Sequence, residues 1–426
     1  MKQFFITGLL ATITCFVSAQ DINAIINAAE VERIEKVLSA DDMKGRKTFS
    51  PEIEKAADFI SAEFQKTGLE KMQGLDSYKQ SFHFLKPQFK GLSCTLDGTT
   101  LSEKEVIVVT TQPDLNINEQ SGYTITNIAK GDELFAKAYE AMQSGKNQVV
   151  LIDTSFSNNF GRLLYFKKQV EPSQATVVFI LTTVQPQHFN IQAKHNFTNL
   201  NLANVAGVLP GKSRKNEYVI FSGHYDHIGI GKTVKNDSIY NGANDDAAGS
   251  TAVMMLAKYF KSLNNNERTL IFVTFTGEEI GGFGSQYFSK QLNPSEVAAM
   301  FNIEMIGTDS KWGKNSAYIT GYDKTDMGKI LEKNLKGSVF KFYADPYTEE
   351  KLFYRSDNAT LAKLGVPAHT ISTSKMDNEP NYHQPSDEIG TLDMNNMAEI
   401  IKAIAISSKS IVSGEDTPSR VKPGDY

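Results

Sequence analysis

The chain has 426 residues, of which 40% are hydrophobic and 22% are charged, and its formal net charge at pH 7 is -5. This composition is typical of a soluble globular protein, and the length allows one large domain with an insertion or two to three ordinary domains. Because the chain is acidic and has no long basic run, its charge argues against a nucleic-acid-binding protein and against attachment to an anionic membrane surface.

The first residues have the pattern of a secretory signal peptide, residues 1–19. Lys2 precedes an apolar run, and residues 17–19 form a small-residue cleavage site that ends at Ala19. The alternatives are a buried N-terminal helix and a lipoprotein, and Thr14 before Cys15 is a poor match to a lipoprotein signal. Cleavage would remove Cys15 and leave Cys94 as the only cysteine, so we expect a secreted or periplasmic chain without an internal disulfide. No other stretch is long and apolar enough to span a membrane.

The mature chain begins, over residues 20–89, with two predicted amphipathic helices. Apolar residues recur at helical spacing over 24–39 and over 52–69, and Gly68 ends the second helix. Residues 40–49 between them are predicted to form a loop.

Residues 90–200 have a different pattern, with short apolar runs between polar loops. The predicted elements are strands over 105–111, 148–154 and 175–183 and a helix over 133–145. Histidines in and near this segment share no motif. We therefore expect an inserted α+β subdomain, or a lid, without a catalytic signature of its own.

From residue 201 to 413, apolar strands alternate with helices. Strands are expected over 204–211, 218–226, 269–279, 298–307, 316–322, around 340 and over 368–373, and helices over 247–263, 283–292, 325–335, 357–364 and 393–411. This alternation predicts an α/β fold with a mostly parallel central sheet and helices on both faces, built from residues 20–89 and 201–413 together. Residues 414–426 are expected to form a C-terminal tail.

Polar residues follow the expected strands at the end where parallel α/β sheets bind their ligands. They are His224, Asp226, Asp245, Glu278, Glu279, Glu304 and His383. Singly, each has an ordinary explanation as a solvated strand end or turn. Together, imidazoles and carboxylates are the ligands that zinc prefers. A site for two metals needs a bridging carboxylate, terminal ligands for each ion, and one carboxylate that binds neither ion and takes a proton from water.

Asp245 and Asp246 stand next to each other in a stretch of small residues, 242–249, and no basic residue lies within five positions. A solvated turn explains an isolated pair of this kind, since Asn, Asp and Gly are common turn formers. The alternative is a cation site, because buried carboxylates need a partner charge or a metal.

Five motifs resemble, in order and spacing, those of the two-zinc exopeptidases of metallopeptidase family 28. This family includes bacterial leucyl aminopeptidases, glutamate carboxypeptidase and, as a one-zinc branch, the glutaminyl cyclases. The motifs are GHYD (223–226), GANDDAAG (242–249), TGEEIGGFGS (276–285), NIEMIG (302–307) and YHQPSDE (382–388). The resemblance covers residues 204–412 well and 30–85 more loosely, and it implies the zinc-exopeptidase fold, which is phosphorylase/hydrolase-like.

Carried over position by position, the resemblance implies two Zn²⁺ ions bridged by Asp245. His224 and Glu304 would complete one site, and Glu279 and His383 would complete the other. The family usually has Asp where this chain has Glu304, so the carboxylate is displaced by about one C–C bond length and we still expect it to be a ligand.

The resemblance also implies two catalytic roles beside the metals. Glu278 would be the general base that takes the proton from the bridging water, and Asp226 would orient the imidazole of His224. Asp246 is expected to be a structural acceptor rather than a ligand, and the peptide bond between Asp245 and Asp246 is expected to be cis.

The function implied is a zinc-dependent exopeptidase acting on peptides, in the first place an aminopeptidase. The alternative is a dipeptidase or carboxypeptidase of the glutamate-carboxypeptidase type, in which Arg355 would bind a substrate carboxylate; a surface ion pair explains Arg355 equally well. A glutaminyl cyclase, which is an acyltransferase, is disfavoured because His224 is present, and a non-catalytic binding domain is disfavoured because it has no need for Glu278. We expect no nucleic-acid partner and, after signal cleavage, no membrane partner; the sequence does not predict an oligomeric state.

Overall fold

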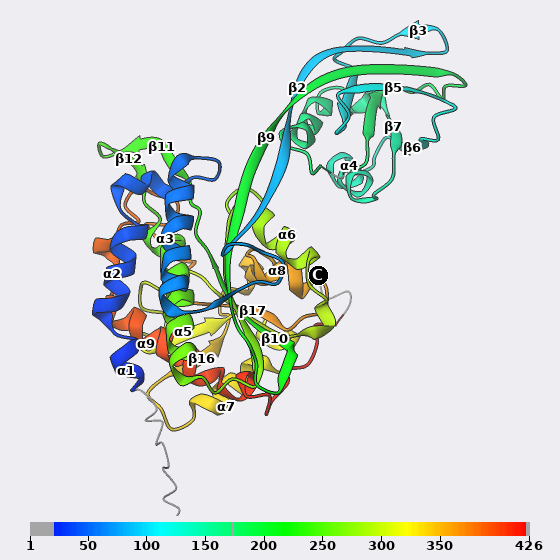
Figure 1. Cartoon of the computed structure of the whole chain (residues 1–426). Helices are drawn as coiled ribbons and strands as arrows, with labels where there is room; N and C mark the ends of the chain where they lie inside the picture. Colours follow the sequence, from blue (N-terminus) through cyan, green and yellow to red (C-terminus); the bar gives the residue numbers. More distant parts are fainter. Residues whose placement is uncertain (1–20, 173, 423–426) are drawn as a thin grey trace, which may run out of the picture. The chain divides into compact units, whose positions relative to one another are not determined.

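The computed structural model describes residues 21–172 and 174–422 (Figure 1). The expected signal peptide therefore lies outside the described residues. The chain forms two compact units, one made of the residues up to Gln80 together with those from Ala203 onward, and the other made of Ser81–Leu202.

The first unit contains the central sheet, which is parallel at its middle. β10 (Arg214–His224) pairs in parallel with β13 (Arg268–Phe275) on one side and with β14 (Val297–Ile303) on the other. β17 (Ala368–Ser372) continues the parallel sheet beside β14. The remaining strands of this unit are β1 (Glu70–Lys71), β15 (Ser316–Ile319), β16 (Lys341–Ala344) and the hairpin of β11 (Gly229–Val234) and β12 (Asp237–Tyr240). Since β15 is antiparallel to β17, the sheet is mixed, and the expected α/β class is confirmed.

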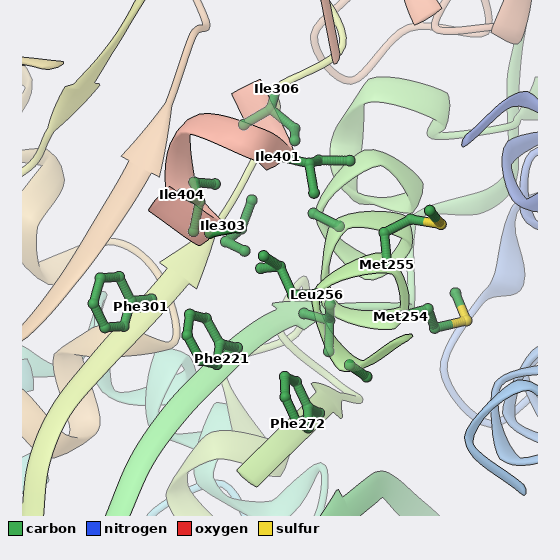
Figure 2. Close-up of a cluster of buried hydrophobic side chains, with 14 of the residues drawn as sticks. Phe221, Met254, Met255, Leu256, Phe272, Phe301, Ile303, Ile306, Ile401 and Ile404 are labelled. Atoms are coloured by element: carbon green, nitrogen blue, oxygen red, sulfur yellow. The ribbon is translucent and has the colours of Figure 1, made fainter. Parts of the chain in front are cut away.

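Helices cover both faces of this sheet because the buried side chains of its strands alternate between two clusters. Phe221 of β10 stacks on Phe272 and Phe301, with ring centroids 5.5 and 5.0 Å apart (Figure 2). Its neighbour Ile220 belongs to the cluster on the opposite face. Burying a large apolar side chain of this kind contributes about 1.5–3 kcal/mol to stability.

The helix that covers the phenylalanine face most directly is α5 (Ala248–Leu263), which contributes Met254, Met255 and Leu256 (Figure 2). The other helices on this side are α1 (Ile22–Ile25), α2 (Ala28–Leu38), α3 (Pro51–Thr67), α7 (Met327–Leu335), α9 (Met394–Ser407) and α10 (Lys409–Val412). The opposite face is covered by α6 (Phe283–Lys290) and α8 (Asn358–Ala362).

The ends of α3 follow from its sequence. The Ser50 side chain accepts a hydrogen bond from the Ile53 amide at 3.3 Å, and Pro51 occupies the first turn. Gly68 ends the helix in the left-handed conformation at φ 78°. The predicted end at Gly68 is confirmed, whereas the predicted loop before α3 contains a short 3-10 helix, Asp41–Arg46.

The second unit has a small sheet in the order β4-β8-β7-β6 and one α-helix, α4 (Leu134–Gln143). Its strands are β4 (Val106–Val109), β6 (Thr124–Ile128), β7 (Gln148–Ile152) and β8 (Val177–Leu181). Two long strands, β2 (Lys79–Leu96) and β9 (Phe189–Leu209), belong partly to each unit, and the end of β9 pairs with β13 in the first unit. Their parts within Ser81–Leu202, with β3 (Thr99–Thr100) and β5 (Asp114–Asn118), complete the second unit. We placed the start of the insertion at residue 90, but β2 continues across that position and the contacts group the chain from Ser81.

The segment after residue 413 packs on the first unit as far as it is described. The Val421 side chain is 2% exposed, and the Arg420 guanidinium donates to the Val297 carbonyl at 2.8 Å. The fully buried guanidinium of Arg268 donates to the Asp416 carbonyl at 2.8 Å. Buried apolar and polar contacts therefore hold residues 414–422 of the expected C-terminal tail.

Among residues 21–172 and 174–422, no helix combines the length and the apolar character needed to cross a membrane.

Candidate metal centre

The centre lies where the carboxyl ends of β10, β13 and β14 meet. The strand pairing places His224 opposite Phe275, three residues before Glu278. On the other side, Ser222 is opposite Asn302, so Glu304 lies level with His224 on the neighbouring strand. Parallel pairing thus brings side chains that are far apart in sequence to one edge of the sheet.

The loop before α5 adds the paired aspartates. The peptide bond between Asp245 and Asp246 is cis, as the resemblance implied. The Asp246 carboxylate accepts hydrogen bonds from the backbone amides of His224, Gly249 and Met305 at 3.1, 3.0 and 3.1 Å, which confirms it as a structural acceptor. A Cβ atom at Gly249 would lie 2.1 Å from a carbonyl oxygen of β14, so the close packing of this loop requires a glycine there.

Two residues that the sequence analysis did not single out hold the same loop. The Asp387 carboxylate accepts from the amides of Asn244 and Asp245 at 2.8 and 3.0 Å, and it is buried. Burial raises the pKa of Asp387 to about 6, although the amide of Asn244 opposes this shift. The fully buried guanidinium of Arg46 donates to the carbonyls of Tyr225, Leu38, Asn241 and Gly242.

His224, Asp245 and Glu304 form the first group of possible metal ligands. The imidazole Nε2 of His224 lies 3.3 Å from Asp245 Oδ1 and 3.7 Å from Glu304 Oε1. On the other side of the ring, Nδ1 lies 3.0 Å from the carbonyl oxygen of Asp226. A carbonyl can only accept, so Nδ1 carries the proton and the Nε2 lone pair faces the two carboxylates. This arrangement needs a cation between them.

His227, Asp245 and Glu279 form the second group. His227 Nδ1 lies 2.7 Å from Glu279 Oε1 and 3.8 Å from Asp245 Oδ2. His383 Nε2 reaches the same place, 3.2 Å from Asp245 Oδ2 and 3.2 Å from Glu279 Oε2. Asp245 therefore presents Oδ1 to the first group and Oδ2 to the second.

The ionisation of these groups shows how strongly the centre requires positive charge. Burial lowers the pKa of His224, but Asp245 and Glu304 outweigh it and hold that pKa well above its ordinary value. Burial raises the pKa of Asp245, but His227, His224 and His383 bring it well below its usual range. Each group has the imidazole and carboxylate donors of zinc sites, so the residues fit a pair of zinc ions that share Asp245.

Glu278 belongs to neither ligand group. Burial, with the charges of Glu304 and Asp357, raises its pKa well above the ordinary value, although His224 opposes the shift. Its backbone amide donates to Asp226 Oδ1 at 3.1 Å.

Asp226 orients His224 through its backbone rather than its side chain, which corrects the sequence-based expectation. The Asp226 carboxylate lies 3.8 Å from His224 Nδ1, whereas the Asp226 carbonyl oxygen lies 3.0 Å from it. The carboxylate instead accepts from the Thr48 hydroxyl at 2.9 Å and from the amide of Glu278.

A cavity of about 260 Å³ opens over both groups. Its lining includes Asp245, Glu278, Glu279, Glu304 and His383, together with Arg355 from the segment before α8. The Arg355 guanidinium donates to Glu350 Oε2 at 3.0 Å, and its side chain is 46% exposed.

This arrangement agrees with a comparison of the sequence with known families. Residues 204–407 match the family described as Peptidase family M28. A probable leucine aminopeptidase of Trichophyton verrucosum is 30% identical to this chain over 209 residues, which cover 47% of the chain and 54% of the relative. The aminopeptidase YwaD of Bacillus subtilis is 24% identical over 236 residues, 53% of the chain and 48% of the relative. The chain thus spans about half the length of the curated relatives it matches.

Solved structures extend the similarity in fold beyond the matched segment. The aminopeptidase from Aneurinibacillus sp. strain AM-1 has a TM-score of 0.54 at 18% identity, covering 96% of this chain and 99% of the other. BSAP, a zinc aminopeptidase from Bacillus subtilis, has a TM-score of 0.55 at 16% identity, covering 94% and 98%. At this level of identity the likeness establishes the fold of this chain and nothing further.

The structure brings together every metal-ligand candidate that the sequence predicted and adds His227 to them. His227 follows GHYD directly, so the four-letter motif stops one residue short of it. Asp387 lies four residues after His383, within YHQPSDE. For His227 and Asp387, the only indication in the sequence was that each lies next to or within a motif. Proximity to a motif does not by itself tell which side chain points toward the centre.

Proposed function

We propose that this chain is a zinc-dependent aminopeptidase, a hydrolase that removes the N-terminal residue from peptides. The observation that carries the proposal is the position of Asp245, whose two carboxylate oxygens face two separate ligand groups while Glu278 stays outside both. The curated relatives named as leucine aminopeptidases support the choice of substrate class.

In this proposal His224 and Glu304 would hold one zinc ion, Glu279 and His383 would hold the other, and Asp245 would offer one carboxylate oxygen to each. When bound, the ions would polarise the scissile carbonyl and lower the pKa of water. Glu278 accepts the proton of the attacking water and then delivers it to the leaving amine, so that the C–N bond breaks without releasing a strongly basic amide anion. Burial raises the pKa of Glu278 above its ordinary value, and a raised pKa favours the protonated form that donates to the leaving amine.

A second candidate is a carboxypeptidase or dipeptidase of the glutamate-carboxypeptidase type. The observation in its favour is that Arg355 carries the only permanent positive charge among the described residues that line the cavity. A guanidinium there could bind a substrate carboxylate in a bidentate manner. However, the Arg355 guanidinium already forms an ion pair with Glu350, and this favours the aminopeptidase.

The test is an assay of the mature chain on two substrate sets, aminoacyl amides with a free amino group and N-blocked peptides with a free carboxyl group. We expect hydrolysis of the first set, its loss with a chelator, its return with zinc, and two zinc ions per chain by metal analysis. Cleavage of only the N-blocked set would select the carboxypeptidase. Saturation at one zinc ion, with cyclisation of N-terminal glutaminyl peptides, would select the cyclase branch and contradict the bridging role of Asp245.

We also propose that the chain is exported and acts as a secreted or periplasmic enzyme. The support is the signal-peptide pattern of residues 1–19. N-terminal sequencing of the protein recovered outside the cytoplasm should begin at Gln20, and a chain that retains Met1 in the cytoplasm would contradict export.

A further inference from the structure

We propose that His227 is a further protein ligand of the metal ion held by Glu279 and His383. This inference rests on the proposed function, because it concerns the same pair of metal ions. It gives that ion four protein ligands, namely His227, Asp245, Glu279 and His383.

The imidazole of His227 is fixed in place by the backbone around it. Its side chain is fully buried, and its amide donates to the Arg46 carbonyl at 3.3 Å. Gly242, in the left-handed conformation at φ 60°, leaves room for the ring, since a Cβ atom there would lie 2.5 Å from the His227 ring carbon Cγ. The ring therefore cannot easily turn away from Asp245 and Glu279.

The distances from the two imidazoles to the two carboxylates lie near the ligand separations around one tetrahedral zinc ion. Bonds of about 2.0–2.2 Å in tetrahedral geometry separate neighbouring ligand atoms by roughly 3.3–3.6 Å. His227 Nδ1 lies 2.7 Å from a Glu279 oxygen and 3.8 Å from an Asp245 oxygen. His383 Nε2 lies 3.2 Å from oxygens of both carboxylates. The measured separations thus lie on both sides of the tetrahedral value, and the His227 and His383 rings are 5.7 Å apart between centroids.

The close approach of His227 to Glu279 is not a hydrogen bond. At 2.7 Å the two atoms are near enough, yet neither His227 Nδ1 nor Glu279 Oε1 has a hydrogen-bond partner among the described residues, so the N–H direction does not face the oxygen. His224 Nε2 behaves in the same way, since it lies 3.3 Å from Asp245 Oδ1 without a hydrogen bond. Two ligand atoms lie close together without a hydrogen bond in this way when the lone pair of each points at the same metal ion.

The consequence is that the two metal sites differ. The site of Glu279 and His383 would have four protein ligands, whereas the site of His224 and Glu304 would have three.

Direct coordination can be tested with His227→Cys and Co²⁺ in place of zinc. Cysteine suits the position because Sγ lies closer to the main chain than Nδ1 does, and the longer Zn–S bond of about 2.3 Å compensates in part. A thiolate bound to Co²⁺ gives an intense near-ultraviolet charge-transfer band. We expect this band in the His227→Cys variant and its absence in the wild-type chain, in which the only cysteine among the described residues is the buried Cys94, and in a matched His369→Cys variant.

Metal content gives the second measurement. His227→Ala should lose one of the two zinc ions, or bind it more than about 100-fold more weakly, because indirect partners of a ligand already contribute 10–100-fold. Should the cysteine variant fail to fold, X-ray absorption on the wild-type zinc protein should find three imidazoles shared by two ions.

Three results overturn the inference, and they are distinct from a failure of the proposed function. They are two-zinc binding of wild-type affinity by His227→Ala, a folded His227→Cys variant that binds Co²⁺ without the band, and two imidazoles instead of three by X-ray absorption. A wild-type chain that hydrolyses aminoacyl amides with two zinc ions would keep the proposed function in each of these cases. A wild-type chain that binds no second ion or cleaves neither substrate set would contradict the proposed function itself.

Discussion

Replacing Glu35 with glutamine is expected to remove a loss of stability that the wild-type chain suffers as the pH rises. Glu35 lies in α2, fully buried, and its Oε1 accepts from the Thr251 hydroxyl at 2.8 Å. Its Oε2 has no hydrogen-bond partner among the described residues. Burial raises the pKa of Glu35 to about 8 from an ordinary 4.5, although Thr251 and Arg46 oppose the shift.

The sign and size of the effect follow from the two pKa values. Below pH 4.5 the carboxyl is protonated in both the folded and the unfolded chain, and it causes no loss. Between pH 4.5 and about 8 only the unfolded chain releases the proton, so the free energy of unfolding falls by about 1.4 kcal/mol per pH unit. The total loss at pH 8 is about 5 kcal/mol at most, and glutamine, which does not ionise, does not incur it.

The assay is urea unfolding of the zinc-loaded wild-type chain and Glu35→Gln at several pH values from 4.5 to 8.5. The difference in unfolding free energy should grow in favour of the variant by about 3–5 kcal/mol over this range. Glu63→Gln, near the surface of α3, is the matched control and should track the wild type apart from the loss of its ion pair with Arg33. A constant difference between Glu35→Gln and wild type would show that Glu35 ionises in the folded chain and would refute the reasoning.

Three further predictions concern the centre itself. Glu278→Gln should lower turnover by roughly 10²–10⁴-fold while keeping both zinc ions, whereas Glu279→Gln should lose zinc; a fully active Glu278→Gln variant would exclude the mechanism. Glu304→Asp should keep activity and Glu304→Ala should bind one zinc ion weakly, and normal metal titration of the alanine variant would show that Glu304 is not a ligand. Asp387→Ala removes the acceptor of two buried amides, so it should lower the free energy of unfolding by about 3–5 kcal/mol and weaken zinc binding; unchanged urea and chelator-competition curves would disprove its positioning role.

Much of the first unit could be predicted because its strands are buried on both faces. Continuous apolar runs such as the one in β13, all of whose residues are buried, separate clearly from the amphipathic helices that follow them. The order of motifs then placed the ligands at successive strand ends. The last part of β9 was expected as a strand over 204–211, whereas the first part of β9 and most of β2 were not predicted. β9 alternates between buried and exposed positions only over residues 189–196, and β2 contains Pro87.

The residues of the centre that the sequence did not reveal lie in turns that follow the strands, and the conformation of each turn decides where their side chains point. Asp226 and His227 are adjacent, and the turn after β10 points the first toward Thr48 and the second toward Glu279. Either residue could have faced the metals on spacing alone. Arg46 is similar, because its four carbonyl acceptors lie at the end of α2, after β10 and in the loop before α5, and only the folded chain brings these segments together.

The hydrogen bonds of Arg46 determine which fragments of this protein can be expressed with an assembled metal centre. Residues 204–407 are the part of the chain that matches the peptidase family. Two residues outside that range nevertheless contact the centre: Arg46 donates to the carbonyls of the loop that carries Asp245, and Lys47 forms a β-bridge with His227. A truncated chain that begins near residue 204 would leave the Asn241 and Gly242 carbonyls without these donors. The smallest fragment able to assemble its metal centre is therefore discontinuous in sequence and must include the N-terminal helices, with the chain from Ser81 to Leu202 as the segment to replace by a linker.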